Sequence, residues 1–387
     1  MAPPVIDFRP SAGPTLGVEW ELALVDGDTL DLVPRADDVV AGVAEALDDE
    51  HVSARVHREL LSNTVEIVTG ICDDVPQVSA DLDSSLRALR QVTDPLGLEL
   101  MCAGTHPFAQ WQSQQVSEGE RYATLIDRTR WWGRQMVIYG VHVHVGITDA
   151  AKVLPILNGM LTYAPHLQAL SASSPFWAGE ETGYASNRAQ MFQQLPTAGL
   201  PFQFDTWPQY ERYVDDLMVT GVIDELKEIR WDIRPAPHLG TLEIRVCDGI
   251  PTLRELAAIT ALVQCLVVWL DDRLTDGGTL RTLPPWHVQE NKWRTARYGM
   301  DSIIICDDRN RERLVTEDLA DLLERLAPVA RRLGCETELA DVEQITRTGA
   351  SYQRQLRVAQ EEGTLVGVAR SLVDELRTGQ PGRPGLA

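Results

Sequence analysis

The chain has little lysine and no paired cysteines. Three lysines (Lys152, Lys227 and Lys292) stand among 35 basic residues, against 57 acidic ones, and the net charge is -22. This balance leaves no basic face for nucleic acid and no polybasic segment for an anionic membrane. The six cysteines form no C-x-x-C pair, so we expect reduced thiols rather than a disulfide framework.

Several short motifs that identify common cofactor sites are also absent. The sequence contains no G-x-x-x-x-G-K-[ST] loop, no G-x-G-x-x-G after a strand, no G-x-S-x-G and no H-E-x-x-H. These absences argue against Walker-type nucleotide binding, dinucleotide binding, serine-hydrolase chemistry and helical zinc proteases. The longest apolar run, 256–270, contains Thr260 and Gln264 and is too short to span a bilayer, so it predicts a buried helix. The first residues lack the basic and apolar parts of a signal peptide, which favours a cytoplasmic location.

The most informative stretch that is present runs from Gly17 to Val25. Its residues alternate between two sides of a predicted strand. One side carries Val18, Trp20, Leu22 and Leu24, and the other carries Glu19, Glu21 and Ala23. Two carboxylates on one side, about 7 Å apart, repel each other unless a cation lies beside them. A half-buried strand with a solvated acidic face is the alternative that this stretch alone leaves open.

The same pattern recurs in three other predicted strands. Each places Glu or His on the side opposite its β-branched residues: Glu66 in 64–68, His142 and His144 in 139–147, and Glu243 with Arg245 in 242–248. An antiparallel sheet with an ordinary solvated face would instead carry Thr, Lys, Ser and Arg there. The recurrence therefore favours a sheet that curves around a carboxylate-rich site for divalent cations.

The remaining pattern predicts one domain with a mostly helical C-terminal part. We expect helices at 37–49, 74–96, 118–135, 154–171, 209–228 and 252–275 and from 311 to 377, and strands at 98–103 and 231–235. The helix at 118–135 is predicted to pack over the site, and the irregular region 173–208 to cover it. The predicted organisation is a loose N-terminus at 1–13, a single catalytic domain at 14–377 and a flexible tail at 378–387.

Carboxylate-dominated sites prefer hard cations such as Mg²⁺ and Mn²⁺, which in enzymes commonly bind phosphates. The nearby basic candidates are Arg188, Arg234, Arg245, Arg294 and Arg297. Together they indicate an anionic substrate, in particular a polyphosphate. A zinc amidohydrolase built on His142-x-His144 is an alternative, although zinc prefers more nitrogen and sulfur ligands.

Six motifs, taken in order, resemble the type 2 glutamate–cysteine ligase family. They are Gly17-Val-Glu-Trp-Glu21, Glu59 with Asn63-Thr-Val-Glu-Ile67, Gly104-Thr-His-Pro107, Gly140-Val-His-Val-His-Val-Gly146, Tyr184-Ala-Ser-Asn-Arg188 and Thr241-Leu-Glu-Ile-Arg245. Each motif is weak alone, but the ordered set covers roughly residues 14–370. The resemblance implies an α+β, glutamine-synthetase-like fold, in which a curved, mainly antiparallel sheet flanked by helices forms an open funnel.

The resemblance also implies roles for individual residues. Glu19, His142 and Glu243 would hold one metal ion, and Glu21, Glu59 and Glu66 a second, with a third ion in some members. His144, Arg188 and Arg245 would face the ATP phosphates, and Arg234 the transferring phosphate or a substrate carboxylate, so that Arg234 and Arg245 are the catalytic candidates. His106, Arg294 and Arg297 are candidates for substrate binding. Glu59 enters only through the resemblance, because its surroundings show no alternation.

The implied activity is ATP-dependent joining of the L-glutamate γ-carboxylate to the L-cysteine amine through an acyl phosphate, with two or three Mg²⁺ or Mn²⁺ ions. Small molecules are the expected partners, without nucleic acid or membrane, and a homodimer is possible from the sequence. Alternatives are the same chemistry on another acid and amine, or a non-catalytic metal- or nucleotide-binding protein. A related guanidino-type phosphotransferase is less compatible, because its reactive cysteine loop is not found.

Overall fold

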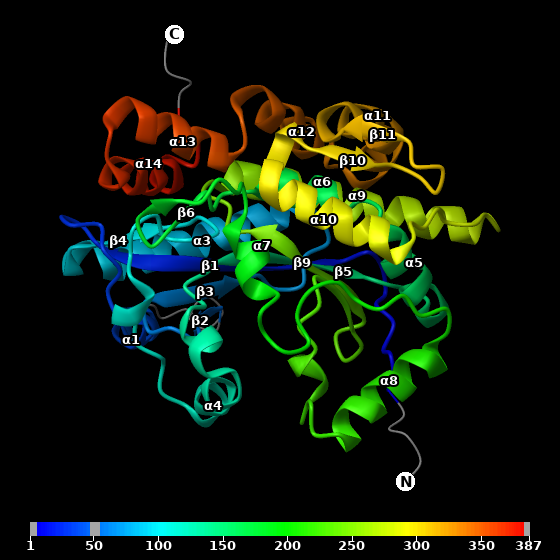
Figure 1. Cartoon of the computed structure of the whole chain (residues 1–387), viewed down its shortest axis with the longest axis horizontal. Coiled ribbons are helices and arrows are strands. Elements are labelled where there is room, and N and C mark those ends of the chain that lie inside the picture. Colours follow the sequence, from blue (N-terminus) through cyan, green and yellow to red (C-terminus); the bar gives the residue numbers. More distant parts are fainter. Residues whose placement is uncertain (1–5, 47–54, 383–387) are drawn as a thin grey trace.

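A seven-stranded sheet forms the centre of the computed structural model, which describes residues 6–46 and 55–382 (Figure 1). The strands are β1 (Leu16–Asp26), β2 (Val56–Arg58), β3 (Thr64–Val68), β4 (Leu98–Met101), β5 (Gly140–Gly146), β8 (Ile233–Ala236) and β9 (Thr241–Asp248). Their order is β2-β3-β1-β5-β9-β8, and β4 pairs with the end of β1. Every pairing is antiparallel, which confirms the predicted α+β class with a mainly antiparallel sheet.

The apolar face of this sheet is covered by helices α3 (Val75–Thr93), α6 (Ala164–Ser171) and α9 (Leu253–Thr275), which contact β1, β9 and β5 respectively. Trp20 at the middle of β1 is fully buried there and donates its indole N–H to the Ile250 carbonyl at 3.1 Å. The alternation of β1 therefore buries one side of the strand and leaves the acidic side on the other face.

Several elements lie around the opposite face or at its edges. They are α1 (Ala36–Ala46), α4 (Glu120–Arg134), α7 (Asn187–Phe192), α8 (Trp207–Val219) and the short hairpin of β6 (Phe176–Trp177) and β7 (Glu180–Glu181). In Figure 1, α1, α4 and α8 lie below the sheet, whereas α6, α9 and the C-terminal helices lie above it. The site described below opens between α4 and the segment that follows α8.

Two predicted helices are shorter than expected, for local reasons. The segment 154–171 is two helices, α5 (Val153–Met160) and α6, because Pro165 has no N–H to donate and occupies the first turn of α6. The predicted helix 209–228 ends at Val219 and is followed by Gly221, whose φ of 70° is the left-handed conformation that glycine adopts easily. The helix 37–49 is confirmed through Ala46, and the rest of that prediction lies outside the described residues.

The C-terminal part is helical, as predicted, apart from one hairpin. It comprises α10 (Pro285–Tyr298), β10 (Ile303–Ile305), β11 (Glu312–Leu314), α11 (Val315–Leu333), α12 (Glu336–Thr348), α13 (Ser351–Glu362) and α14 (Leu365–Thr378). Among the described residues, α9 is the one helix long and apolar enough to cross a membrane, but 83% of its apolar window is buried inside the fold. It serves as the core helix, as its interrupted apolar run predicted.

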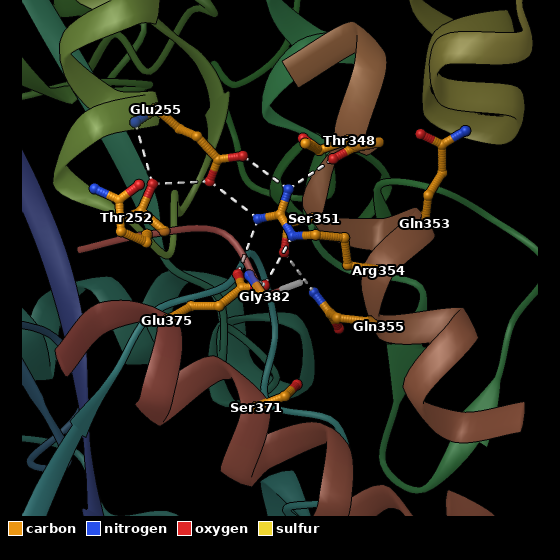
Figure 2. A network of polar contacts seen from close by, with 12 residues as sticks. Thr252, Glu255, Thr348, Ser351, Gln353, Arg354, Gln355, Ser371, Glu375 and Gly382 are labelled. Carbon is orange, nitrogen blue, oxygen red and sulfur yellow. Dashed lines mark hydrogen bonds and ion pairs between the residues drawn. The ribbon is translucent and has the colours of Figure 1, made fainter. Parts of the chain in front are cut away.

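A buried ionic network connects the last helices to α9 (Figure 2). Arg354 of α13 donates to both oxygens of Glu255 at 2.8 and 3.0 Å and to both oxygens of Glu375 at 2.8 and 2.9 Å. Its remaining N–H bonds the Gly349 carbonyl at 2.6 Å, so all five guanidinium donors are used. The three side chains are 5–6% exposed, and they fix α13 and α14 against the core helix.

Where they are described, both ends of the chain contact the rest of the fold. Residues 6–13, part of the segment expected to be loose, form no helix or strand, yet Phe8 is buried and the Ser11 N–H donates to the Ile147 carbonyl at 2.9 Å. At the other end, the Gly382 N–H donates to Glu375 at 2.8 Å. The rest of the expected tail lies outside the described residues.

Candidate active site

The polar face of the sheet forms one wall of a cavity of about 730 Å³. Its other walls come from α4, from α7 and the residues after it, and from the segment 222–230. Ten of the residues singled out in the sequence line this cavity: Glu19, Glu21, Glu59, Glu66, His142, His144, Arg188, Arg234, Glu243 and Arg245. Alternation within separate strands selected those of them that lie on β1, β3, β5 and β9, whereas Glu59 came from the resemblance and Arg188 from the irregular region.

Strand register explains why they meet. Glu21 of β1 stands opposite Glu66 of β3, and Glu19 stands opposite His142 of β5. Further along, Glu243 of β9 stands between His144 of β5 and Arg234 of β8. Directly opposed residues have Cβ atoms about 5 Å apart. The paired strands therefore produce a continuous row of carboxylate, imidazole and guanidinium groups across the sheet.

At one end of the row, three carboxylates crowd together. Ligand oxygens of Glu21, Glu59 and Glu66 lie within 4.8 Å of one another. Burial, together with the charge of Glu59, raises the pKa of Glu21 to about 7. Burial and three neighbouring carboxylates raise the pKa of Glu66 well above its usual range, and burial raises that of Glu59. Nearby arginines offset this only in part, and among the described residues none of the three carboxylates forms an ion pair, which is the situation that a bound cation relieves.

In the middle of the row, Glu19 contacts two imidazoles. One of its oxygens lies 2.7 Å from His142 Nδ1 and the other 3.3 Å from His144 Nε2. Burial opposes ionisation of Glu19, but the hydrogen bonds of the two histidines hold its pKa well below the usual range. Burial and the nearby Arg245 lower the pKa of His142 to about 4, so His142 is neutral near pH 7 and has a lone pair for a metal.

At the far end, Glu243 lies between two arginines. Arg234 contacts both of its oxygens, at 2.6 Å from Nε and 3.2 Å from Nη2, and Arg245 contacts one of them. Despite burial, the charges of Arg245 and Arg234 hold the pKa of Glu243 below its usual range. Burial lowers the pKa of Arg234, whereas the charge of Glu243 raises that of Arg245. Both arginines therefore face the cavity as fixed cations.

Arg188 of α7 reaches the same cavity from the long irregular region. It is 3% exposed, donates to the Arg245 carbonyl at 3.2 Å and lies over the Phe192 ring. A Cβ on Gly140 would overlap its guanidinium, so only glycine at the start of β5 permits this approach. Its buried Nε has no hydrogen-bond partner among the described residues, which leaves a donor for an anion.

Three sequence candidates are not brought to the cavity. His106 is buried elsewhere: its Nε2 lies 2.9 Å from the Leu30 carbonyl, and its Nδ1 accepts the Ala109 N–H at 3.0 Å. Arg294 pairs with Glu290 and Glu312 on α10 and β11, and Arg297 donates to the Gly183 carbonyl. None of the three lines the site. Each has a structural partner instead, and we do not include them in the proposal below.

Three arginines that the sequence did not select individually line the cavity: Arg121, Arg128 and Arg230. Arg121 and Arg128 belong to α4, whose packing over the site was predicted, and Arg128 pairs with Glu228 at 2.8 Å and with Asp224 across the opening. Arg230 lies in the loop before β8, where no periodicity marks it. Cys247, in contrast, is fully buried and outside the cavity, and burial raises the pKa of its thiol to about 12.

The donor set fits divalent cations. The structure brings three groups together: Glu21 with Glu59 and Glu66, Glu19 with Glu66 and His142, and Glu19 with His144 and Glu243. The first group is the same as one of the two sets implied by the resemblance. The third group differs from the other implied set, because it contains His144 where the resemblance implied His142. Oxygen-rich ligands with one imidazole suit Mg²⁺ and Mn²⁺. The unpaired carboxylates around Glu66 fit a cation best, because Glu243 already neutralises two arginines.

Comparison with solved structures defines the class of fold. A glutamate–cysteine ligase from Francisella tularensis in complex with AMP superimposes with a TM-score of 0.66 at 13% identity, covering 96% of this chain and 90% of that one. A bifunctional glutathione synthetase from Pasteurella multocida gives 0.65 at 15% identity, covering 95% of this chain and 52% of that one. The chain therefore shares its fold with these two solved ligases.

Comparison of sequences gives the family. The model of glutamate–cysteine ligase family 2 matches residues 15–375. "Putative glutamate--cysteine ligase 2-1" of Arthrobacter sp. (strain FB24) is 60% identical over 380 residues, covering 97% of this chain and 99% of the relative. "Putative glutamate--cysteine ligase 2" of Mycobacterium tuberculosis (strain H37Rv) is 60% identical over 372 residues, covering 96% and 97%. The chain therefore belongs to glutamate–cysteine ligase family 2 and is an ATP-dependent ligase that forms a C–N bond, which confirms the resemblance.

Proposed function

We propose that this ligase joins the γ-carboxylate of L-glutamate to the amine of L-cysteine, with ATP converted to ADP and phosphate. The observation that carries the proposal is the row of acidic, imidazole and guanidinium side chains on one wall of a single cavity. Such a row serves a substrate whose negative charge is large and changes during reaction, as in transfer of the ATP γ-phosphoryl group.

In this mechanism, Glu21, Glu59 and Glu66 would hold one cation, and Glu19 would contribute to another with His142 or His144. When bound, Mg²⁺ or Mn²⁺ would neutralise negative charge on the phosphates during transfer. The hydrogen bonds that His142 and His144 make to Glu19 keep this carboxylate ionised and oriented. A buried, pre-oriented ligand set requires little rearrangement when nucleotide arrives.

The arginines act on the anionic atoms. Arg245 and Arg234 are held by Glu243, and their remaining N–H groups stabilise charge on the γ-phosphoryl oxygens as the glutamate γ-carboxylate attacks phosphorus. Arg188 has a buried Nε without a partner among the described residues and contacts a phosphate or the acyl phosphate that results. The amine of cysteine then attacks the activated carbonyl and expels phosphate.

The test is ADP release with Mg²⁺ and ATP, first with L-glutamate alone and then with each amino acid added singly. We expect release that requires both glutamate and cysteine, and γ-glutamylcysteine in the mass spectrum. Glu19→Gln is the matched control, because it keeps the shape of the side chain and removes the charge that His142 and His144 bond. Its turnover should be lower by at least about 100-fold, since a positioned electrostatic group is removed.

Two results would separate the parts of this proposal. Release that depends on another acid or amine would retain the ligase chemistry and overturn the substrate pair. Equal activity in wild type and Glu19→Gln would overturn the assignment of this row of residues to catalysis.

A further inference from the structure

Arg230 is one of the arginines around the cavity that form no ion pair among the described residues, whereas Arg128, Arg234 and Arg245 each pair with a carboxylate. It lies in the loop between α8 and β8, and its backbone N–H donates to the Thr197 carbonyl at 3.2 Å. Its guanidinium donates to the Glu228 carbonyl at 3.0 Å, which positions the side chain without neutralising it. Within residues 6–46 and 55–382, no carboxylate lies within the 4.0 Å of an ion pair.

The neighbouring acidic group is already engaged. The Glu228 carboxylate accepts from Arg128 at 2.8 Å with one oxygen and from the Asp224 and Glu225 N–H groups at 2.9 and 3.1 Å with the other. Arg234 and Arg245, in turn, are paired with Glu243. The Glu228 charge that acts on Arg230 is therefore already paired with Arg128, and Arg230 is a half-buried cation without an ion pair among the described residues.

Burial of a charge without an ion-pair partner disfavours the charged form. Desolvation, reinforced by Arg245, Arg121 and Arg234, lowers the pKa of Arg230 to about 10 despite the opposing charge of Glu228. An isolated buried charge is tolerated in proteins where a ligand provides the opposite charge. The cavity that Arg230 lines is the space from which such a ligand would approach.

The proposed reaction uses the γ-carboxylate of one amino acid and the amine of the other. The α-carboxylate of each substrate does not react, so it is available for recognition. A carboxylate matches the two parallel N–H groups of a guanidinium. Arg230 lines the same cavity from a loop and is not part of the row on the sheet to which the phosphates and cations are assigned in the proposed function.

We propose, on the basis of the function above, that Arg230 binds the α-carboxylate of an amino-acid substrate and selects for a free acid at that position. The carboxylate comes from glutamate or from the amine substrate, and these sources can be distinguished experimentally. L-isoglutamine keeps the γ-carboxylate of glutamate but has an amide in place of the α-carboxylate. L-cysteinamide keeps the amine of cysteine but has an amide in place of its carboxylate.

The experiment measures kcat/KM for L-glutamate against L-isoglutamine and for L-cysteine against L-cysteinamide, in wild type and Arg230→Gln. We expect wild type to prefer the acid by about 10- to 100-fold in one pair, the size of a charged hydrogen-bonded contact. Arg230→Gln should reduce that preference to about threefold or less and leave the other pair unchanged. Because the intrinsic reactivity of each amide is the same with both proteins, the change in the ratio isolates the contact.

Arg212→Gln is the matched control, because Arg212 is an exposed arginine of α8 that does not line the cavity. It should behave as wild type. Arg230→Lys keeps the charge without the planar fork, so its preference should be intermediate. The KM for ATP should stay within about twofold in every variant. Unchanged acid preference in both pairs, or an increased KM for ATP alone, would overturn the role of Arg230.

Absence of turnover in wild type would instead concern the proposed function. In that case, isothermal titration with the same four compounds, in the presence of Mg²⁺ and a non-hydrolysable ATP analogue, decides the question separately. Tighter binding of one acid than of its amide, lost in Arg230→Gln, supports the contact. Equal binding of acid and amide by wild type overturns it.

Discussion

Replacing Arg354 with methionine should destabilise the whole fold, because it leaves the carboxylates of Glu255 and Glu375 buried without a cation (Figure 2). Loss of one partner from a buried ionic network typically lowers the free energy of unfolding by about 3–5 kcal/mol. The unfolding entropy of a 387-residue chain is about 0.8 kcal/mol/K. The expected decrease in Tm is therefore about 4–6 °C.

The pH dependence provides a second test. Burial already raises the pKa of Glu255 in the wild type, although Arg354 opposes this. Without the arginine, the carboxyl groups of the folded variant bind protons more tightly than those of the unfolded chain, whose pKa is near 4.3. Protonation then relieves the repulsion as pH falls, so the stability deficit should be smaller at pH 5.5 than at pH 8.

Thermal unfolding followed by circular dichroism at both pH values measures the effect. The control is Arg347→Met on α12, where the residue is exposed and its partner Glu343 is 4.0 Å away, so little change is expected. Two results would refute this reasoning. One is a Tm of Arg354→Met within about 1 °C of the wild type, and the other is a loss of stability that is larger at pH 5.5 than at pH 8. Either would mean that removing Arg354 does not leave buried, uncompensated carboxylates.

Three further results are expected. Glu66→Gln should lower turnover by about 100-fold or more, because it removes a proposed metal ligand. Without metal, the variant should melt above the wild type, because a buried carboxylate crowded by three others is removed, but Mg²⁺ should raise its Tm less. Trp20→Ala should lower the free energy of unfolding in a denaturant titration by about 3–5 kcal/mol, since a fully buried indole and its bond to Ile250 are removed. Burial alone would raise the pKa of Asp318, but the hydrogen bond from His166 outweighs it and lowers this pKa to about 2. Ionised Asp318 therefore stabilises the fold above pH 3.8 and loses this effect as pH falls towards 2. Acid-unfolding curves of Asp318→Asn should lack that pH dependence.

The sequence predicted most of the site because the relevant signal is local. Alternation with a period of two assigns Glu19, Glu66 or His142 to a face without knowledge of neighbouring strands. What alternation does not contain is register, which decides that His144 rather than His142 shares a group with Glu243. Register depends on pairing between residues far apart in the sequence, such as Glu19 with His142 and His144 with Glu243.

Residues in irregular segments were harder to predict. Glu59 follows β2 in a loop and was found only through the resemblance to a family, and Arg230 was not found at all. His106, Arg294 and Arg297 looked equally functional in sequence, because a charged or imidazole group has no signature that distinguishes a structural hydrogen bond from a substrate contact. The distinction came from their partners in the fold.

The position of β1 at the centre of the sheet has a consequence for biosynthesis. β1 leaves the ribosome early, but β5 begins at Gly140 and β9, which completes the row, begins only at Thr241. At a translation rate of ~5–20 residues per second, on the order of ten seconds or more pass between synthesis of β1 and synthesis of β9. During that interval its apolar side and unpaired edge are available to other nascent chains. We therefore expect chaperone dependence during synthesis, and aggregation of fragments that end before β9.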